Sequence, residues 1–339
     1  MEELGARKQA ILKEIVEAYI RTGEPVGSKW LSARLENAVS SATVRNEMAD
    51  LTALGYLSQP HTSAGRLPTA EAMRLYVDRL MTRRPLEKER QEEIDRRLSL
   101  STGDPERLLG ETTRLLSETT GYAALTAAPA AAGVLLKAEM LRRSERTVML
   151  AVMTASGALR SRFCRIDGDL SNEALRRLSD AFARLAGQPL SDISRAQMQT
   201  LLSSLGENSL QLAGIVAGFY EMIGELQQSD VHLTGEWRLL QNPDYPSETI
   251  RQLLGFLSKR ERLSAMLSAC PREMQVLLGS ESRCPELSGS SVILTRYSSG
   301  GRSSGSLGLI GPVRMDYART IPQMEYLAKT VSRLLSAAW

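Results

Sequence analysis

Apolar residues near the N-terminus recur with the spacing of an amphipathic helix. One stripe with a period of 3.6 residues, between residues 7 and 22, holds Ile11, Leu12, Ile15, Val16, Tyr19 and Ile20. Gly23 and Pro25 follow directly, and both residue types end helices. The pattern therefore predicts a helix over 7–22 with one buried face.

Two further helices are predicted before residue 55. A short one is expected to be capped by Ser28 and to direct Trp30, Leu31 and Leu35 toward a core. The next begins at Ser40 or Ser41, both good N-cap residues, and Gly55 ends it. Its apolar positions are Val44, Met48, Leu51 and Leu54.

The pattern then changes to that of a hairpin. We expect a short strand over 56–59, a turn over 60–65 and a return strand at 66–67. Thr69 is a suitable cap for a helix that runs to about Met81. Three helices, a strand, a polar turn, a strand and a helix are the elements of a winged helix-turn-helix, in order.

The remainder alternates between helices and strands. The charged stretch 82–91, with Pro85 in the middle, marks a domain boundary, and Asp104-Pro105-Glu106 opens a helix. Strands are predicted at 122–128, 134–141, 147–153, 159–166, around 232–234, and at 274–279, 291–297 and 306–311. Helices are predicted at 171–186, 194–205, 208–228, 247–257 with Ser247 as cap, 259–269 and 320–338. The Ala-rich stretch 127–133 is a connection, and 134–166 is an antiparallel meander.

Composition fits an intracellular multidomain protein. The chain has 339 residues, of which 42% are hydrophobic and 24% charged, enough for two or three ordinary domains. It has neither an apolar run long enough to span a membrane nor the pattern of a signal peptide, so we expect a cytoplasmic protein. The net charge of +3 permits a polyanionic partner if the positive charge is local.

Few residues are suited to catalysis or metal binding. The three cysteines, Cys164, Cys270 and Cys284, are far apart and are expected to be buried or half-buried, and there are only two histidines. We find no nucleophile–base pair, metal cluster or cofactor fingerprint, so we predict no catalytic residue, no metal and no cofactor.

Three other features have structural interpretations. The Gly-rich segment 298–308 lacks the lysine and helix of a phosphate-binding loop and fits a flexible hairpin loop. Arg314 and Asp316 fit an ion pair or a helix cap. His232 and Trp237 fit packing positions.

The helix after residue 40 has the surface of a recognition helix. With Val44, Met48 and Leu51 in the core, a rotation of 100° per residue places a small, polar face opposite. That face holds Ala42, Asn46 and Ala49, with Thr43 and Arg45 to one side. Asn46 can pair with adenine and Arg45 with guanine or phosphate, whereas Ser40, Ser41 and the helix N-terminus suit a phosphate oxygen.

The wing is the second candidate contact. Its residues are Gln59, Pro60, His61, Thr62, Ser63, Ala64, Gly65 and Arg66. The side chains are short hydrogen-bonding groups and one arginine, and the glycine frees the backbone to approach a nucleic-acid strand. Arg66 can contact phosphate or enter the minor groove. After the wing, positive charge is added by Arg74, Arg79, Arg83 and Arg84.

A plainer interpretation fits the same residues. Many folds begin with three helices, and in such a fold Ser41 is only a cap, Asn46 a solvated surface residue and His61 a turn residue. Periodicity alone leaves both interpretations open.

Longer stretches carry a family resemblance. The stretch SSATVRNEMADLTALGYLSQPHTSAGRLPT, residues 40–69, closely resembles the signature of the heat-inducible transcription repressor family HrcA. The stretch 11–32 is similar to that family's first two helices, and 308–335 to its closing strand and helix. The resemblance is colinear over the whole chain, with 95–290 matching by pattern more than by motif.

The resemblance implies an α+β multidomain fold and a regulatory function. It implies a winged helix-turn-helix DNA-binding domain at 1–84, a GAF-like α/β domain at 85–133 and 229–339, and an inserted dimerising domain, with an antiparallel sheet and helices, at 134–228. Such a repressor binds double-stranded DNA at the CIRCE inverted repeat of chaperone operons as a homodimer. It depends on the chaperonin GroEL for activity, lies in the cytoplasm on the nucleoid, and binds no membrane.

Alternatives remain at this level. One is a metabolite-sensing winged-helix repressor with a small-molecule effector in the GAF-like domain. Others are an enzyme with a DNA-binding head, and a structural oligomerisation protein with a fortuitous helix-turn-helix.

Overall fold

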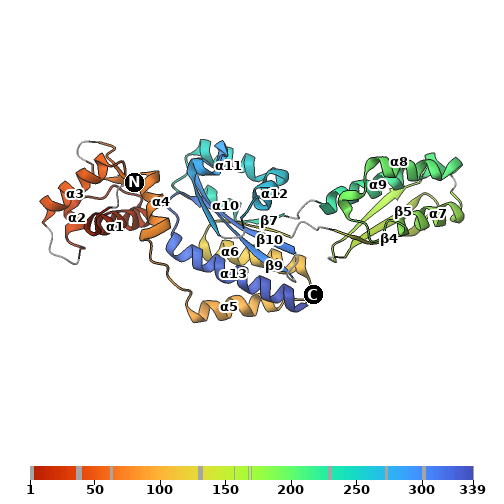
Figure 1. Cartoon of the computed structure of the whole chain (residues 1–339), viewed down its shortest axis with the longest axis horizontal. Coiled ribbons are helices and arrows are strands. Elements are labelled where there is room, and N and C mark those ends of the chain that lie inside the picture. Colours follow the sequence, from red (N-terminus) through yellow and green to blue (C-terminus); the bar gives the residue numbers. More distant parts are fainter. Residues whose placement is uncertain are drawn as a thin grey trace. The chain divides into compact units, whose positions relative to one another are not determined.

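The computed structural model (Figure 1) describes residues 4–35, 40–61, 64–128, 133–155, 157–166, 168, 170–227, 231–271, 274–299 and 303–338. The chain forms two compact units. Unit 1 comprises Met1–Thr126, His232–Tyr297 and Ser306–Trp339, and unit 2 comprises Ala127–Val231 and Ser298–Gly305. The expected mixed α+β, multidomain fold is confirmed. The three domain ranges given above stay a prediction.

Unit 1 begins with the three predicted helices, α1 (Ala6–Thr22), α2 (Ser28–Ser32) and α3 (Ser41–Ala53). The apolar stripe of α1 is buried because Ile11, Leu12, Ile15 and Val16 pack in the core of this region. Ser40 is the N-cap of α3, as one of the two predicted positions.

Three expectations for these helices are wrong. Ser28 is the first residue of α2 rather than its cap, since Gly27 holds the N-cap position. Trp30 is exposed and lies against the guanidinium of Arg34, 5.0 Å from the ring centre, instead of facing the core. Leu54 is exposed because the helix ends one residue before it.

The hairpin and fourth helix follow as predicted. Strands β1 (Leu57–Ser58) and β2 (Leu67–Pro68) pair antiparallel; β1 is shorter than expected, and β2 is shifted by one residue. Thr69 caps α4 (Ala70–Leu75) by accepting from the Ala72 N–H, and the helix continues as a π-turn, η1 (Tyr76–Leu80). This order of elements is that of a winged helix-turn-helix.

The rest of unit 1 is built on a five-stranded sheet in the order β7-β3-β10-β9-β8. Its strands are β3 (Ala123–Ala127), β7 (Val231–Thr234), β8 (Gln275–Leu278), β9 (Ser290–Ser299) and β10 (Ser303–Pro312). Strand β3 lies between β7 and β10, so the sheet joins a strand that precedes most of unit 2 in the sequence with strands that follow it. Strands β9 and β10 run into the Gly-rich stretch 298–308. It is therefore mostly strand, not the expected loop, and residues 300–302 lie outside the described residues.

The helices that accompany this sheet are α5 (Lys88–Ser99), α6 (Pro105–Thr120), α10 (Glu236–Leu240), α11 (Ser247–Leu257), α12 (Arg260–Ser268) and α13 (Tyr317–Ala338). The cap predicted for α6 is confirmed, because the Asp104 carboxylate accepts from the N–H groups of Glu106 and Arg107. Ser247 is the first residue of α11 and not its cap. Trp237 is half exposed beneath Arg238, so its assignment as a packing residue is wrong.

Unit 2 is a three-stranded antiparallel sheet covered by helices. The predicted meander is confirmed as β4 (Leu135–Ser144), β5 (Thr147–Thr154) and β6 (Leu159–Arg165). Helices α7 (Asn172–Ala183), α8 (Arg195–Ser204) and α9 (Ser209–Gln227) complete it. The apolar helix α9 packs on β5 and β6, and Phe219 on it stacks on Phe182 of α7 with ring centres 4.2 Å apart. Its apolar surface thus serves the core of this unit.

Among the described residues, no helix is both long and apolar enough to cross a bilayer.

Gly235, between β7 and α10, should be the least replaceable glycine of unit 1. Its φ is +89°, and an added Cβ would lie 2.0 Å from Ser117 Oγ and 2.8 Å from the Tyr122 carbonyl oxygen. We expect Gly235→Ala to lower the free energy of unfolding by about 2 kcal/mol or more, measured by thermal or urea unfolding of the whole chain.

Gly255→Ala is the matched control. Gly255 lies inside α11 with nothing within 4 Å of an added Cβ, so alanine should stabilise the helix by about 0.5–1 kcal/mol. Equal unfolding curves for the two variants would contradict the strain argument.

Candidate nucleic-acid interface

Helix α3 presents the face that its sequence predicts. Val44, Met48 and Leu51 are buried, whereas Ala42, Arg45, Asn46 and Ala49 are exposed. The burial of one face fixes the rotation of the helix and therefore directs Asn46 and Arg45 to solvent. Contact of these side chains with nucleic acid stays a prediction.

The start of α3 is held by the hydroxyl groups of four residues. The Thr43 N–H donates to Ser40 Oγ at 3.1 Å, and the hydroxyls of the same two residues lie 2.9 Å apart. Ser41 Oγ lies 3.3 Å from Ser28 Oγ, which links α3 to α2. The N-terminal turn, with its partial positive charge, is thus fixed against the preceding helix.

The acidic residues of α3 are neutralised by α1. Lys8 Nζ lies 3.1 Å from Glu47 and 3.0 Å from Asp50, and Arg7 lies 3.9 Å from Glu47. The hydrogen bonds to Asp50 and Glu47 raise the pKa of Lys8, which favours the protonated ammonium group in this contact. Arg45 has no carboxylate partner among the described residues. The exposed face of α3 therefore carries a cation whose charge is not cancelled locally.

The wing is anchored to the segment between α1 and α2. Arg66 and Val26 exchange both backbone hydrogen bonds, each 2.9 Å long. An added Cβ on Gly65 would lie 2.5 Å from the carbonyl carbon and oxygen of Val26. Gly65 is thus required by the wing's own contact with the chain. This contact alone requires a glycine, and approach of the wing backbone to a nucleic-acid strand stays a prediction.

The wing side chains are only partly described. Gln59 and His61 are exposed, and Gln59 Nε2 donates to the Ala64 carbonyl at 3.2 Å. Arg66 is half-buried, with its Nε enclosed by protein. Thr62 and Ser63 lie outside the described residues.

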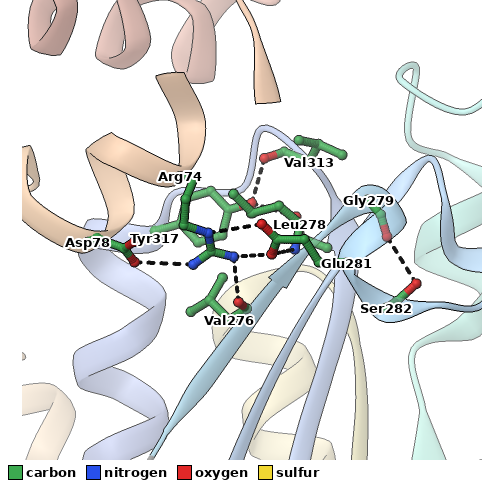
Figure 2. Close-up of polar contacts among 10 residues, drawn as sticks. Arg74, Asp78, Val276, Leu278, Gly279, Glu281, Ser282, Val313 and Tyr317 are labelled. Carbon is green, nitrogen blue, oxygen red and sulfur yellow. Dashed lines mark hydrogen bonds and ion pairs between the residues drawn. The ribbon is translucent and has the colours of Figure 1, made fainter. Parts of the chain in front are cut away.

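The arginines after the wing are mostly engaged within unit 1. Arg74 pairs with Glu281 (Figure 2), Arg83 with Glu325 at 2.6 Å and Arg84 with Asp316 at 3.5 Å. The positive charge that these three were expected to add after the wing is therefore largely cancelled by carboxylates. Arg79 is exposed and has no ion pair among the described residues.

Arg314 and Asp316 were expected to form either an ion pair or a helix cap. They do not pair with each other. Arg314 pairs with Asp244 at 2.6 Å and donates to the Ile20 carbonyl at the end of α1 at 3.0 Å. Asp316 accepts from the Arg319 N–H at 3.3 Å and so caps α13, the other expected role.

The cysteines lie as predicted, with Cys164 and Cys270 buried and Cys284 half-buried. Burial raises the pKa of the Cys164 and Cys270 thiols, which disfavours their reactive thiolate forms. In the part of the chain that the structure describes, no three His, Cys, Asp or Glu side chains are grouped as a metal site requires.

Comparisons with known proteins agree with the sequence resemblance. The family model described as HrcA protein C terminal domain matches residues 106–321. The heat-inducible transcription repressor HrcA of Geobacter sulfurreducens is 33% identical over 343 residues, covering 99% of both chains. The HrcA repressor of Chromobacterium violaceum is 35% identical, covering 98% of this chain and 99% of its own. A crystal structure of a hypothetical protein shares the fold, with a TM-score of 0.65 and 24% identity over 99% of this chain and 100% of its own.

Gly65→Ala should detach the wing without unfolding the rest of the chain. The added methyl group cannot fit beside the Val26 carbonyl, so the paired backbone bonds of Val26 and Arg66 must open. We expect the amides of both residues to exchange at least about tenfold faster, corresponding to ~1.4 kcal/mol, in hydrogen-exchange measurements on the whole protein.

Gly27→Ala is a suitable control, because an added Cβ there has nothing within 4 Å. It should leave exchange at Val26 and Arg66 unchanged. Unchanged exchange in Gly65→Ala as well would show that the wing does not depend on this close approach.

Proposed function

Since the chain belongs to the HrcA family of heat-inducible transcription repressors, we propose that it represses chaperone operons by binding the CIRCE inverted repeat as a homodimer, with its activity modulated by the chaperonin GroEL. The family assignment makes the protein a transcription repressor of the heat-shock response, not an enzyme. The operator, the dimer and the chaperonin are parts of the proposal.

The exposed face of α3 is the observation that carries the proposal. A recognition helix must present polar side chains to a major groove about 12 Å wide without bringing unpaired carboxylates near phosphates. Here Lys8 pairs with both acids of α3 and Arg7 lies near one of them, while Asn46 and Arg45 stay exposed. We assign base contacts to Asn46 and Arg45, with Ala42 and Thr43 close to the base edges.

Phosphate contacts are assigned to the two ends of this surface. Ser40 and Ser41 lie at the N-terminus of α3, where backbone N–H groups and the helix dipole favour a phosphate oxygen. In the wing we assign backbone or minor-groove contacts to Gln59, His61, Thr62, Ser63 and Arg66.

The outer face of the sheet in unit 2 supports a dimer. Leu141, Met149 and Phe163 lie side by side across the three strands, and Met153 pairs with Leu159. Leu141, Leu159 and Phe163 are each more than half exposed, whereas the opposite face of the sheet packs on helices. Apolar patches of this kind mark interfaces.

A second copy of this chain is the occupant that fits this face. An inverted repeat is read by a protein with two-fold symmetry, and such symmetry requires one self-complementary surface. Both signs of charge border the apolar side chains, since Lys137 and Glu139 lie on β4 and Arg143 lies 5.0 Å from the Phe163 ring. This face in a lone copy is also apolar surface of the kind that a chaperonin retains, which supports the proposed modulation.

A metabolite-sensing repressor is the second candidate. A polar pocket of about 360 Å³ within unit 1 favours it, because its lining includes Tyr76, Tyr122, Asp244 and Arg314. A small-molecule effector would raise the melting temperature of the protein as its concentration rises above its Kd.

The first test measures binding to a duplex with the CIRCE repeat and to a scrambled duplex, at two salt concentrations, with and without chaperonin. We expect repeat-dependent binding that chaperonin enhances. Asn46→Ala should weaken binding to the repeat by about 1–3 kcal/mol and relax discrimination at one base pair. Gln199→Ala, which removes an exposed amide from α8, should change neither quantity.

The outcomes separate the two candidates. Repeat-dependent binding without a chaperonin effect would favour the small-molecule effector. Equal, salt-sensitive binding to both duplexes would show only phosphate contact and would contradict the operator assignment.

Phe163→Asp should convert the dimer into monomers. A carboxylate within the apolar sheet face would be buried unpaired in the dimer, and we expect at least about a hundredfold weaker self-association in analytical ultracentrifugation. Leu210→Asp is the control, because Leu210 on α9 is 85% exposed but does not lie on the sheet. Equal effects of both substitutions would exclude this face as the dimer contact.

A further inference from the structure

Arg74 connects the winged-helix region (residues 4–84) to the five-stranded sheet of unit 1, called the central sheet below. It lies in the last turn of α4, and its guanidinium has three partners (Figure 2). Nη1 lies 3.2 Å from Asp78, Nη2 donates to the Val276 carbonyl at 2.7 Å, and Nε and Nη2 both contact the Glu281 carboxylate. Two of the three partners lie about 200 residues further along the chain.

This contact covers the edge of the sheet. Strand β8 is an edge strand of the sheet. Two of its backbone groups, the Val276 carbonyl and the Leu278 N–H, form hydrogen bonds with side chains instead of with a further strand. Arg74 donates to the Val276 carbonyl, and Glu281 accepts from the Leu278 N–H at 2.9 Å. The Arg74–Glu281 pair thus occupies the place of a further strand. A groove of about 580 Å³, lined by residues of α4, η1 and β8, lies around the pair.

The geometry of Arg74 is more restrictive than that of its neighbours. Arg83 and Arg84 are 57% and 62% exposed in their ion pairs, where such contacts stabilise little. Arg74 is 30% exposed and uses its planar fork on a carboxylate and a carbonyl. Burial opposes ionisation of Glu281, but the bonds from Arg74 and the Leu278 N–H still leave its pKa below the ordinary value.

A second arginine, Arg314, extends from the rest of unit 1 to the winged-helix region. Arg314 extends from the turn before α13, pairs with Asp244 and donates to the Ile20 carbonyl at the end of α1. Gly23, with a φ of +74°, leaves room for its guanidinium, which would lie 3.2 Å from an added Cβ. The winged-helix region is therefore held at α4 and at the end of α1, in addition to the exposed ion pairs and the Arg84 backbone bond at its C-terminal end.

We propose that the Arg74–Glu281 contact is a positioning device that fixes the winged-helix region on the central sheet, and thereby sets the half-site spacing that the dimer accepts. The inference rests on the proposed binding of an inverted repeat. A dimer gains affinity from its second half-site only if both recognition helices are held at the matching separation. A winged-helix region that swivels on its linker loses part of that gain and accepts several spacings.

The test compares Arg74→Gln, Glu281→Gln and the double variant on four duplexes. These carry the natural repeat, the repeat with its half-sites moved by two base pairs, a single half-site, and a scrambled sequence. We expect each single variant to bind the natural repeat about tenfold more weakly, with binding to the single half-site unchanged and the spacing preference reduced. The double variant should match the single ones, because both remove the same contact.

Arg79→Gln is the matched control. It removes the same charge from the π-turn next to α4, where the arginine has no ion pair in the described part of the chain. It should leave the spacing preference unchanged. Glu281→Gln keeps the proposal testable if Arg74→Gln lowers stability, and thermal unfolding of each variant monitors this.

Two results would overturn the proposal. In the first, Arg74→Gln loses half-site binding and about one unit of the slope of log K against log salt concentration, whereas Glu281→Gln has no effect. That result would make Arg74 a phosphate contact. The other is an unchanged spacing preference in all three variants. Failure of the proposed function is distinguishable, because the wild-type protein would then not prefer the natural repeat over the scrambled duplex.

Discussion

The pairing of β3 with β7 and β10 is the constraint on which unit 1 depends. Strand β3 precedes most of unit 2 in the chain, whereas its neighbours β7 and β10 come after most of it. The sheet therefore forms only when the segments that lead into and out of unit 2 lie close together. Buried contacts enforce this closure: an added Cβ on Gly308 in β10 would lie 3.0 Å from Leu267 and 3.4 Å from Leu125. The closed sheet then provides β8 as an edge strand, and Arg74 binds to that edge. The position of the winged-helix region thus depends on a sheet that most of the chain is needed to build.

Local patterns in the sequence predicted the elements well because their causes are local. The apolar stripe of α1, the caps at Ser40, Thr69 and Asp104, and the meander of β4 to β6 each depend on residues close together in the chain. The rotation of α3 follows from three apolar residues, and this is why the exposure of Asn46 could be predicted. Two caps were misplaced by one residue, at Ser28 and Ser247, because a serine fits the first turn of a helix as well as its cap.

Contacts between distant residues could not be predicted in this way. Nothing near Arg74 in the sequence indicates that its partners are Val276 and Glu281, so the sequence counts it among the positive charges that follow the wing. The neutralisation of Glu47 and Asp50 by Lys8 depends on how α1 crosses α3, which periodicity does not specify. The wing sequence indicates that Gly65 permits a close approach of the backbone, but it does not indicate that Val26 lies there. For the candidate site, then, sequence indicated which side chains are exposed, and the structure added which charges remain free.

The outer face of the sheet in unit 2 makes the solubility of this chain depend on its surroundings. Leu141, Leu159 and Phe163 form a flat apolar surface on a copy that has no partner, and flat apolar sheet surfaces stick to one another without specificity. A copy of the chain whose sheet face is uncovered is therefore exposed to non-specific association, and anything that covers Leu141, Leu159 and Phe163 removes that hazard.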